Sequence, residues 1–180
     1  MDRILILGPC WAGKSTLARK IGKIHELPVI HLDQHYWRAG WTEPTAEEWR
    51  EQVEALIAQS QWIMDGNYGG SLARRLQRTQ LVVNLDFPRR VFFPRMVWRS
   101  LSQYGRTRPD LAPDCPEQID LEFWRYTWRY RNDVHPRREA RIAKAGAPVI
   151  RMRTPRELKA WLSAGAPLTG EMPEMLAARG

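Results

Sequence analysis

The feature that most constrains this chain is a glycine-rich octapeptide near its start. Residues 8–15 read Gly-Pro-Cys-Trp-Ala-Gly-Lys-Ser, the spacing G-x-x-x-x-G-K-S. An apolar run precedes it and an amphipathic segment follows it, which is the context that separates a phosphate-binding P-loop from a chance match. In such a loop the backbone N–H groups point inward, and the next helix presents its positive end. The motif therefore predicts binding of a nucleoside triphosphate, ATP or GTP.

Individual positions of this loop have expected roles. We expect Lys14 to reach the β- and γ-phosphates and Ser15 to bind Mg²⁺ through its hydroxyl. Thr16 is placed to bond the α-phosphate. The predicted nucleotide-binding residues of the loop are Gly8, Pro9, Cys10, Trp11, Ala12, Gly13, Lys14, Ser15 and Thr16.

Short apolar runs recur along the 180 residues, each followed by loop or helix signals. This alternation is typical of a parallel sheet with helices on both faces. We therefore expect an α/β fold in a single domain over residues 1–165, with a lid region at about 100–135 and a C-terminal tail at 166–180. The five predicted strands are residues 3–7, 28–32, 62–64, 81–85 and 148–152.

Helix signals fill the segments between these strands. Thr45 and Glu48 have the spacing of a capping box, and Thr154 followed by Pro155 begins a last helix that should end near Gly165. The first predicted helix, residues 15–25, has an apolar stripe. That stripe consists of Leu17, Ala18, Ile21 and Ile24.

Charge and cysteine content indicate the kind of ligand and the cellular compartment. The net charge of +8 indicates attraction to polyanions, either nucleotides or nucleic acid. No apolar run approaches the roughly 20 residues of a membrane span, and the first residues lack the pattern of a signal peptide. Cys10 and Cys115 have neither metal-ligand spacing nor a disulfide framework, which fits a reducing compartment. We expect a cytoplasmic protein.

An aspartate follows each of three predicted strands. Because the carboxyl ends of parallel strands meet at one edge, we expect Asp33 and Asp65 beside the P-loop. Asp65 is the second predicted magnesium residue, and Asp33 is predicted to orient or deprotonate an acceptor hydroxyl. For Asp86, capping of the next helix is the favoured interpretation.

These landmarks resemble the adenylate-kinase-like branch of P-loop kinases, which includes nucleoside monophosphate kinases, shikimate kinase and gluconate kinase. The match consists of the P-loop, Asp65-Gly66, Asp86-Phe87-Pro88 and Arg153-Thr154-Pro155. The resemblance implies a three-layer α/β/α fold with a five-stranded parallel sheet in the order 2-3-1-4-5. It also implies that Asp65 holds magnesium through water. Arg95 would then lie beside the base, Arg99 on phosphates, and the turn at Arg153 against the base.

A narrower resemblance is to the small bacterial topology modulation proteins, often called FlaR-like. It is carried by H-L-D-x-x-Y-W around Asp33, D-G-N-Y at residues 65–68, and G-R-T-R-P-D at residues 105–110. That name describes a cellular phenotype and no reaction. Asn67 and Tyr68 replace the F-P-R of adenylate kinases, so the arginine that grips an acceptor nucleotide there is missing. Asp33, after the second strand, instead resembles the carboxylate that touches the acceptor in kinases that phosphorylate a hydroxyl.

A lid and an acceptor pocket complete the expected site. Arg125 and Arg129, four residues apart, are the preferred lid arginines on transferring phosphate, before Arg106 and Arg108. A solvated basic helix face is the alternative, and Leu121, Trp124 and Trp128 form the expected apolar stripe of that helix. Candidate acceptor residues are Asp33, Tyr36, Trp37, Asn67 and Tyr68, although packing against the core is the favoured interpretation for Tyr36, Trp37 and Trp41.

Three functions compete at this point. The leading one is a Mg²⁺-dependent kinase that transfers the γ-phosphoryl of ATP or GTP to a small-molecule hydroxyl or nucleotide. The second is a nucleotide-gated nucleic-acid-binding protein, and the third a plain NTPase. The sequence carries no helix-turn-helix, zinc-finger or RNA-binding aromatic motif. It also lacks an acidic pair after the fourth strand, which many motor ATPases use to activate water.

Overall fold

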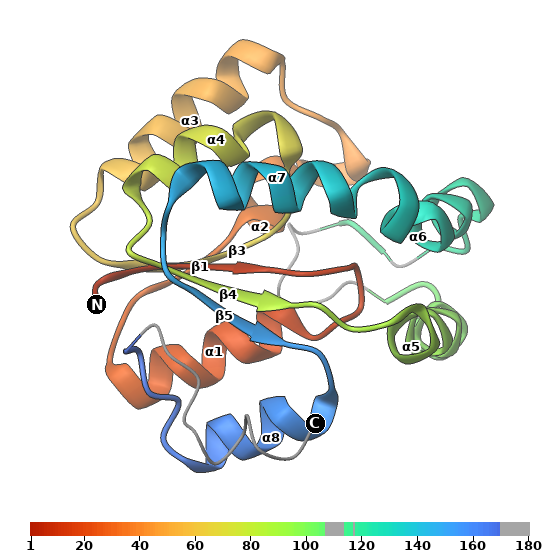
Figure 1. The fold of residues 1–180 in the computed structure, drawn as a ribbon. Coiled ribbons are helices and arrows are strands. Elements are labelled where there is room, and N and C mark those ends of the chain that lie inside the picture. The colour runs from red at the N-terminus through yellow and green to blue at the C-terminus, as the bar shows by residue number, and fades with distance from the viewer. Residues whose placement is uncertain (107–113, 117, 170–180) are drawn as a thin grey trace.

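A five-stranded, fully parallel sheet forms the centre of the computed structural model, which describes residues 1–106, 114–116 and 118–169 (Figure 1). Its strand order is β2-β3-β1-β4-β5, which confirms the prediction. The strands are β1 (Arg3–Leu7), β2 (Val29–His31), β3 (Trp62–Asp65), β4 (Leu81–Leu85) and β5 (Val149–Met152).

Helices cover both faces of this sheet, so the predicted three-layer α/β/α arrangement is confirmed (Figure 1). On one face α1 and α8 lie against the sheet, and on the other α3, α4 and α7. The helices are α1 (Lys14–His25), α2 (Leu32–Tyr36), α3 (Ala46–Ala58), α4 (Gly69–Arg78), α5 (Arg89–Ser102), α6 (Leu121–Asp133), α7 (His135–Ala145) and α8 (Pro155–Ser163), with a 3₁₀ turn, η1, at Ala39–Trp41.

Strand register brings the predicted acidic strand ends together. Asp65 lies opposite Ile6 of β1 on one side and His31 of β2 on the other. Both neighbours stand at the carboxyl ends of their strands, so β3 delivers Asp65 between the P-loop and the start of α2. Asp33 follows in the first turn of α2, because β2 ends at His31 and Leu32 already begins that helix.

The predicted capping signals are confirmed. Thr45 accepts a hydrogen bond from the Glu48 N–H, and Glu48 accepts one from the Thr45 N–H, a complete capping box at the start of α3. Thr154 likewise accepts from the Glu157 N–H at the start of α8. Local hydrogen bonding decided these boundaries, which is why the sequence revealed them.

The apolar stripe of α1 departs from the prediction at Ile24, which is 45% exposed. Gly22 takes its place on the packed face. A Cβ at Gly22 would lie 2.5 Å from Val29 Cγ2, so α1 lies tightly against β2 at this residue. Ile24 is thereby directed away from the sheet.

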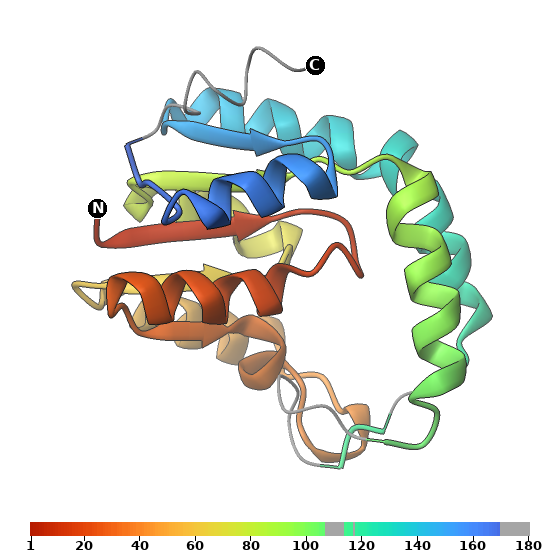
Figure 2. The same cartoon turned by 90° about the horizontal axis from the view of Figure 1, so that it is seen from below.

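Helix α6 also buries a different stripe from the one predicted. Leu121 is 72% and Trp128 50% exposed, whereas Thr127 and Tyr130 are buried. The Tyr130 ring meets Phe92 of α5 edge to face, with centroids 6.2 Å apart. Contact with α5 therefore selects the buried face, and α5 and α6 lie side by side beyond the carboxyl ends of the strands (Figure 2).

No helix within the described residues is both long enough and apolar enough to span a bilayer.

Candidate functional site

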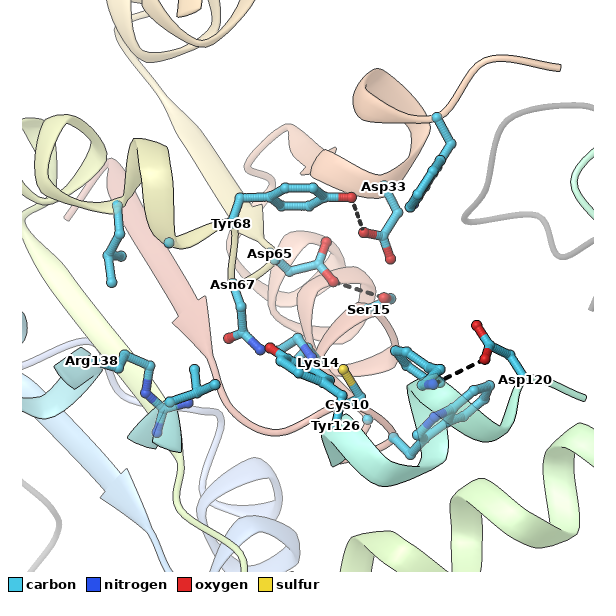
Figure 3. Close-up of a pocket in the computed structure, with 18 of the residues that line it drawn as sticks. Cys10, Lys14, Ser15, Asp33, Asp65, Asn67, Tyr68, Asp120, Tyr126 and Arg138 are labelled. Carbon is cyan, nitrogen blue, oxygen red and sulfur yellow. Dashed lines mark hydrogen bonds between the residues drawn. The ribbon is translucent and has the colours of Figure 1, made fainter. Parts of the chain in front are cut away.

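A cavity of about 1060 Å³ opens at the carboxyl edge of the sheet (Figure 3). The P-loop, the loop after β3, the start of α2 and the facing sides of α6 and α7 enclose it. Most predicted site residues border this one space. Those are Cys10, Trp11, Gly13, Lys14, Ser15, Thr16, Asp33, Trp37, Asp65, Asn67, Tyr68 and Arg99.

The conformation of the P-loop depends on its two glycines. A Cβ at Gly8 would lie 2.8 Å from Leu85 Cβ and 2.9 Å from Leu85 O, so only glycine lets the loop pass β4. Gly13 caps α1 in the left-handed region with φ 91°. The loop then turns into α1, whose first amides face the cavity and can hold an anion.

Lys14, Ser15 and Asp65 lie at the mouth of this loop. Lys14 Nζ donates to the Pro9 carbonyl at 3.0 Å, which folds the ammonium back over the loop. Ser15 Oγ donates to Asp65 Oδ2 at 2.7 Å. Strand β3 and helix α1 thus bring a hydroxyl and a carboxylate to one point.

His31 is a site neighbour that the sequence analysis did not single out. Its Nδ1 lies 2.6 Å from Asp65 Oδ1, and both side chains are buried. Asp65 is consequently held from two sides, by His31 on one oxygen and Ser15 on the other. The parallel register of β2 and β3 produces this contact, which the spacing in the sequence does not reveal.

Asp33 borders the same cavity as the P-loop, and Tyr68 Oη donates to Asp33 Oδ1 at 2.6 Å (Figure 3). Burial, followed by the charge of Asp33 and this hydrogen bond, raises the pKa of Tyr68. The phenol therefore keeps its proton and remains a donor. Asn67 lies beside it, with Nδ2 donating to the Gly8 carbonyl at 2.8 Å.

The aromatic residues after Asp33 both pack and line the cavity. Tyr36 meets Trp37, Trp49 and Tyr68 with ring centroids 4.7–5.0 Å apart, and it lies outside the described lining. Trp37 and Trp41 border the cavity, and Trp41 Nε1 donates to the Pro116 carbonyl at 3.0 Å. Trp37 and Trp41 also pack against buried Cys115.

The predicted arginines separate into two groups. Arg99 borders the cavity, and its guanidinium lies over the Trp11 ring at 4.7 Å from the centroid. Arg95 and Arg153 are exposed and lie outside the described lining. Arg125 and Arg129 line a separate, smaller hollow on α6. Arg106 is exposed, and Arg108 lies outside the described residues.

Three arginines of α7 border the cavity instead, and the sequence reasoning did not single them out. They are Arg137, Arg138 and Arg141. Their spacing of one and three residues is that of any basic helix, so only the packing of α7 against α4 and α6 distinguishes them. Arg141 donates to the Gly69 carbonyl at 2.6 Å, next to Tyr68.

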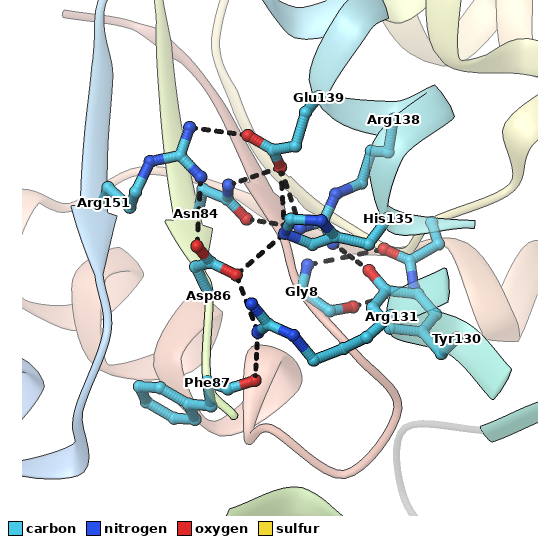
Figure 4. Close-up of polar contacts among 11 residues, drawn as sticks. Gly8, Asn84, Asp86, Phe87, Tyr130, Arg131, His135, Arg138, Glu139 and Arg151 are labelled. Carbon is cyan, nitrogen blue, oxygen red and sulfur yellow. Dashed lines mark hydrogen bonds and ion pairs between the residues drawn. The ribbon is translucent and has the colours of Figure 1, made fainter. Parts of the chain in front are cut away.

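Asp86 belongs to a network of charged residues behind the P-loop (Figure 4). It accepts from Arg131 at 3.1 Å, from His135 Nε2 at 2.8 Å and from Arg151 at 3.4 Å. Pro88 takes the N-cap position of α5, so the helix-cap interpretation of Asp86 is wrong. The network joins β4 and β5 to α6 and α7.

The donor set at Ser15 and Asp65 suits Mg²⁺. This cation prefers hard oxygen ligands and keeps several waters alongside one or two carboxylates and substrate phosphates. A hydroxyl and a carboxylate 2.7 Å apart beside a phosphate-binding loop match that preference. Among the described residues no cluster of three or more His, Cys, Asp or Glu side chains could hold a metal on its own.

Comparison with solved structures shows which fold this is. The chain is similar to shikimate kinase from Aquifex aeolicus vf5, with 14% identity, 91% of this chain and 98% of that one covered, and a TM-score of 0.51. It is also similar to shikimate kinase from Bacteroides thetaiotaomicron, with 17% identity, 91% of this chain and 95% of that one covered, and a TM-score of 0.53. A gluconokinase from Sinorhizobium meliloti 1021 is similar too, with 13% identity, 98% of this chain and 92% of that one covered, and a TM-score of 0.52. No protein-family model and no curated protein matches the sequence. The chain thus has the fold of the P-loop kinases.

Proposed function

We propose that this protein is a small-molecule kinase that transfers the γ-phosphoryl group of ATP or GTP to a hydroxyl. One observation carries the proposal. The P-loop with its Ser15–Asp65 pair and the Tyr68-bound carboxylate of Asp33 border the same cavity. A phosphate-binding loop facing a carboxylate is what hydroxyl phosphorylation requires. The structurally similar shikimate kinases and gluconokinase are named as kinases of small molecules, which agrees with this activity.

The chain's own groups have distinct tasks in this proposal. The P-loop amides and Lys14 hold the phosphates in line with the acceptor. Ser15 and Asp65 would hold Mg²⁺, which would supply neutralisation of phosphate charge. Asp33 orients the acceptor hydroxyl and accepts its proton as the new P–O bond forms and the bond to the leaving oxygen of the nucleoside diphosphate breaks.

Cations around the phosphates come from α5 and α7 in this proposal. Arg99, Arg137 and Arg141 border the cavity, whereas Arg125 and Arg129 line the separate hollow on α6. Fixed positive groups stabilise the charge that spreads over the transferring phosphoryl. Arg137 and Arg141 therefore replace Arg125 and Arg129 as the preferred lid arginines. Arg95 and Arg153, both exposed, remain proposed contacts of the base from the family resemblance.

The acceptor class follows from what stands opposite the P-loop. Asp33, Trp37 and Tyr68 offer a carboxylate and aromatic surface, which suits a hydroxyl-bearing compound. The resemblance to topology modulation proteins leaves nucleic acid as the competing ligand. A steep log–log dependence of DNA affinity on salt would favour that alternative.

An acceptor screen tests the proposal. Labelled ATP and GTP with Mg²⁺ would be offered to sugars, small hydroxy acids, nucleosides and nucleoside monophosphates, beside a reaction without acceptor. We expect label on one class of acceptor and little release of phosphate without it. Rapid phosphate release with no labelled acceptor would make the protein an NTPase and contradict the proposal.

A further inference from the structure

One buried arginine has no carboxylate among its partners in the part of the chain that the structure describes. Arg75 of α4 is 0% exposed, and burial lowers the pKa of its guanidinium. Its described partners are neutral oxygens: the Gly66 carbonyl at 2.9 Å, the Asn67 carbonyl at 2.5 Å, the Tyr68 carbonyl at 3.0 Å and Ser71 Oγ at 3.2 Å. Burying a cation costs free energy unless hydrogen bonds compensate for the lost water. Here the compensating bonds go to three consecutive carbonyls, and these bonds fix the backbone path of residues 66–68.

The backbone that Arg75 holds has an unusual conformation. Tyr68 has φ 28° and Gly66 has φ 133°. Residues other than glycine seldom adopt positive φ values. A Cβ at Gly66 would lie 2.9 Å from Leu32 Cβ, so the loop also presses against the start of α2. Strain of this kind persists only where surrounding contacts enforce it. Here the strained residue carries the phenol that reaches Asp33.

The ring of Tyr68 is fixed as firmly as its backbone. It packs against Tyr36 and Trp49 with centroids 4.7 and 5.1 Å away. Its hydroxyl has one described acceptor, Asp33 Oδ1 at 2.6 Å. The contacts therefore run in series from Arg75 through the 66–68 backbone to the phenol and then to the carboxylate.

We propose that Tyr68, held in place by Arg75, is the positioning residue that orients Asp33 toward the acceptor hydroxyl. The inference rests on the proposed kinase function. Tyr68 donates to one oxygen of Asp33 and thereby fixes the direction in which the carboxylate faces the cavity. Tyr68 acts through Asp33, so its contribution should vanish when Asp33 cannot accept a proton.

Kinetic measurements on Tyr68→Phe, Asp33→Asn and the double variant test this role. Tyr68→Phe removes one oxygen and keeps the packed ring. We expect kcat to fall about 10- to 100-fold, with nucleotide KM unchanged, because small misplacements of a reacting group cost rates of this order. Tyr68→Phe should have no further effect in the Asp33→Asn background. Tyr104→Phe, at a 65% exposed tyrosine, is the matched control and should leave kcat unchanged.

A measurement without turnover separates this inference from the proposed function. The ¹³Cζ resonance of Tyr68 should move on Asp33→Asn, while that of Tyr104 stays in place. An unmoved Tyr68 resonance, a wild-type kcat for Tyr68→Phe, or a full additional loss in the Asp33→Asn background each overturns the positioning role. Absence of transfer to any acceptor by the wild type would instead overturn the proposed function.

Discussion

Ser15 Oγ donates a hydrogen bond to Asp65 Oδ2 across 2.7 Å, although fifty residues separate the two. The contact joins the first turn of α1 to the end of β3 and places a hydroxyl and a carboxylate at the mouth of the P-loop. His31 holds the second oxygen of the same carboxylate at 2.6 Å. The proposed magnesium site therefore depends on the register of β3 with β2 and on the packing of α1 against β3.

Asp65→Asn should weaken Mg²⁺ binding to the nucleotide complex. The amide keeps the shape of the side chain but loses its charge, and substitutions around a metal commonly cost 10- to 100-fold in affinity. Calorimetric titration of Mg²⁺ into protein saturated with nucleotide would measure this change. Nucleotide affinity without Mg²⁺ serves as the control and should remain as in wild type. Equal Mg²⁺ affinities in variant and wild type would remove Asp65 from the site.

Gly8→Ala should destabilise the fold. The new methyl would lie 2.8 Å from Leu85 Cβ and 2.9 Å from the Leu85 carbonyl, so β1 and β4 would have to separate. Overpacking of this kind costs about 1–3 kcal/mol. Gly70→Ala in α4 meets no atom within 4 Å and should be neutral or stabilise the protein by about 0.5 kcal/mol. Urea denaturation compares the two, and equal stabilities would show that the loop passes β4 differently.

Arg75→Met should be far more damaging than Arg74→Met next to it. Removing Arg75 leaves the carbonyls of residues 66–68 without their buried donor, a loss of about 3 kcal/mol or more. Arg74 is 47% exposed and pairs with Glu54, a surface ion pair worth less than about 1 kcal/mol. Thermal unfolding of both variants checks the contrast. Similar losses would mean that Arg75 does not hold the loop.

Glu139 of α7 extends the network behind the P-loop, because it accepts from Arg151 at 2.6 Å and from Arg138 at 3.1 Å (Figure 4). It should make the protein sensitive to acid. Burial acts to raise the pKa of Glu139, but the hydrogen bond from Arg151 and the charge of Arg138 together hold it below its ordinary value. A carboxyl whose pKa is lower in the folded state stabilises the protein fully above its unfolded pKa. That stabilisation is lost as the pH falls through the folded value.

Glu139→Gln tests this sign. The variant should be less stable than wild type above about pH 5, where a free glutamate is ionised, and the difference should shrink as the pH falls further. Glu47→Gln, at a glutamate 74% exposed, should show no such trend. Denaturation measured at several pH values gives the comparison. A difference that grows toward low pH would have the wrong sign for this network.

Much of the fold could be predicted because local signals agree with the tertiary arrangement. The β1–P-loop–α1 unit, the Thr45 capping box and the Thr154 N-cap all depend on neighbours within a few residues. The apolar runs marked all five strands for the same reason. The strand order came from the family resemblance, and the solved structures with this fold agree with it.

The features that the sequence did not predict depend on contacts between segments far apart in the chain. Ile24 and Leu121 fit an apolar stripe by spacing, but the close approach of Gly22 to Val29 and of Tyr130 to Phe92 turned both outward. His31 is recognisable only through its register with Asp65. Helix periodicity cannot tell which arginines of α6 and α7 face a cavity, because that depends on how each helix rotates against its neighbours.

Phosphoryl transfer in matched Lys14→Ala and Asp33→Asn variants tests the central claim most directly. Label from γ-labelled ATP would be followed to the acceptor found in the screen, alongside nucleotide affinity by calorimetry. The account predicts that both variants lose transfer, and that Asp33→Asn still binds nucleotide as the wild type does. Transfer at the wild-type rate by either variant would contradict it.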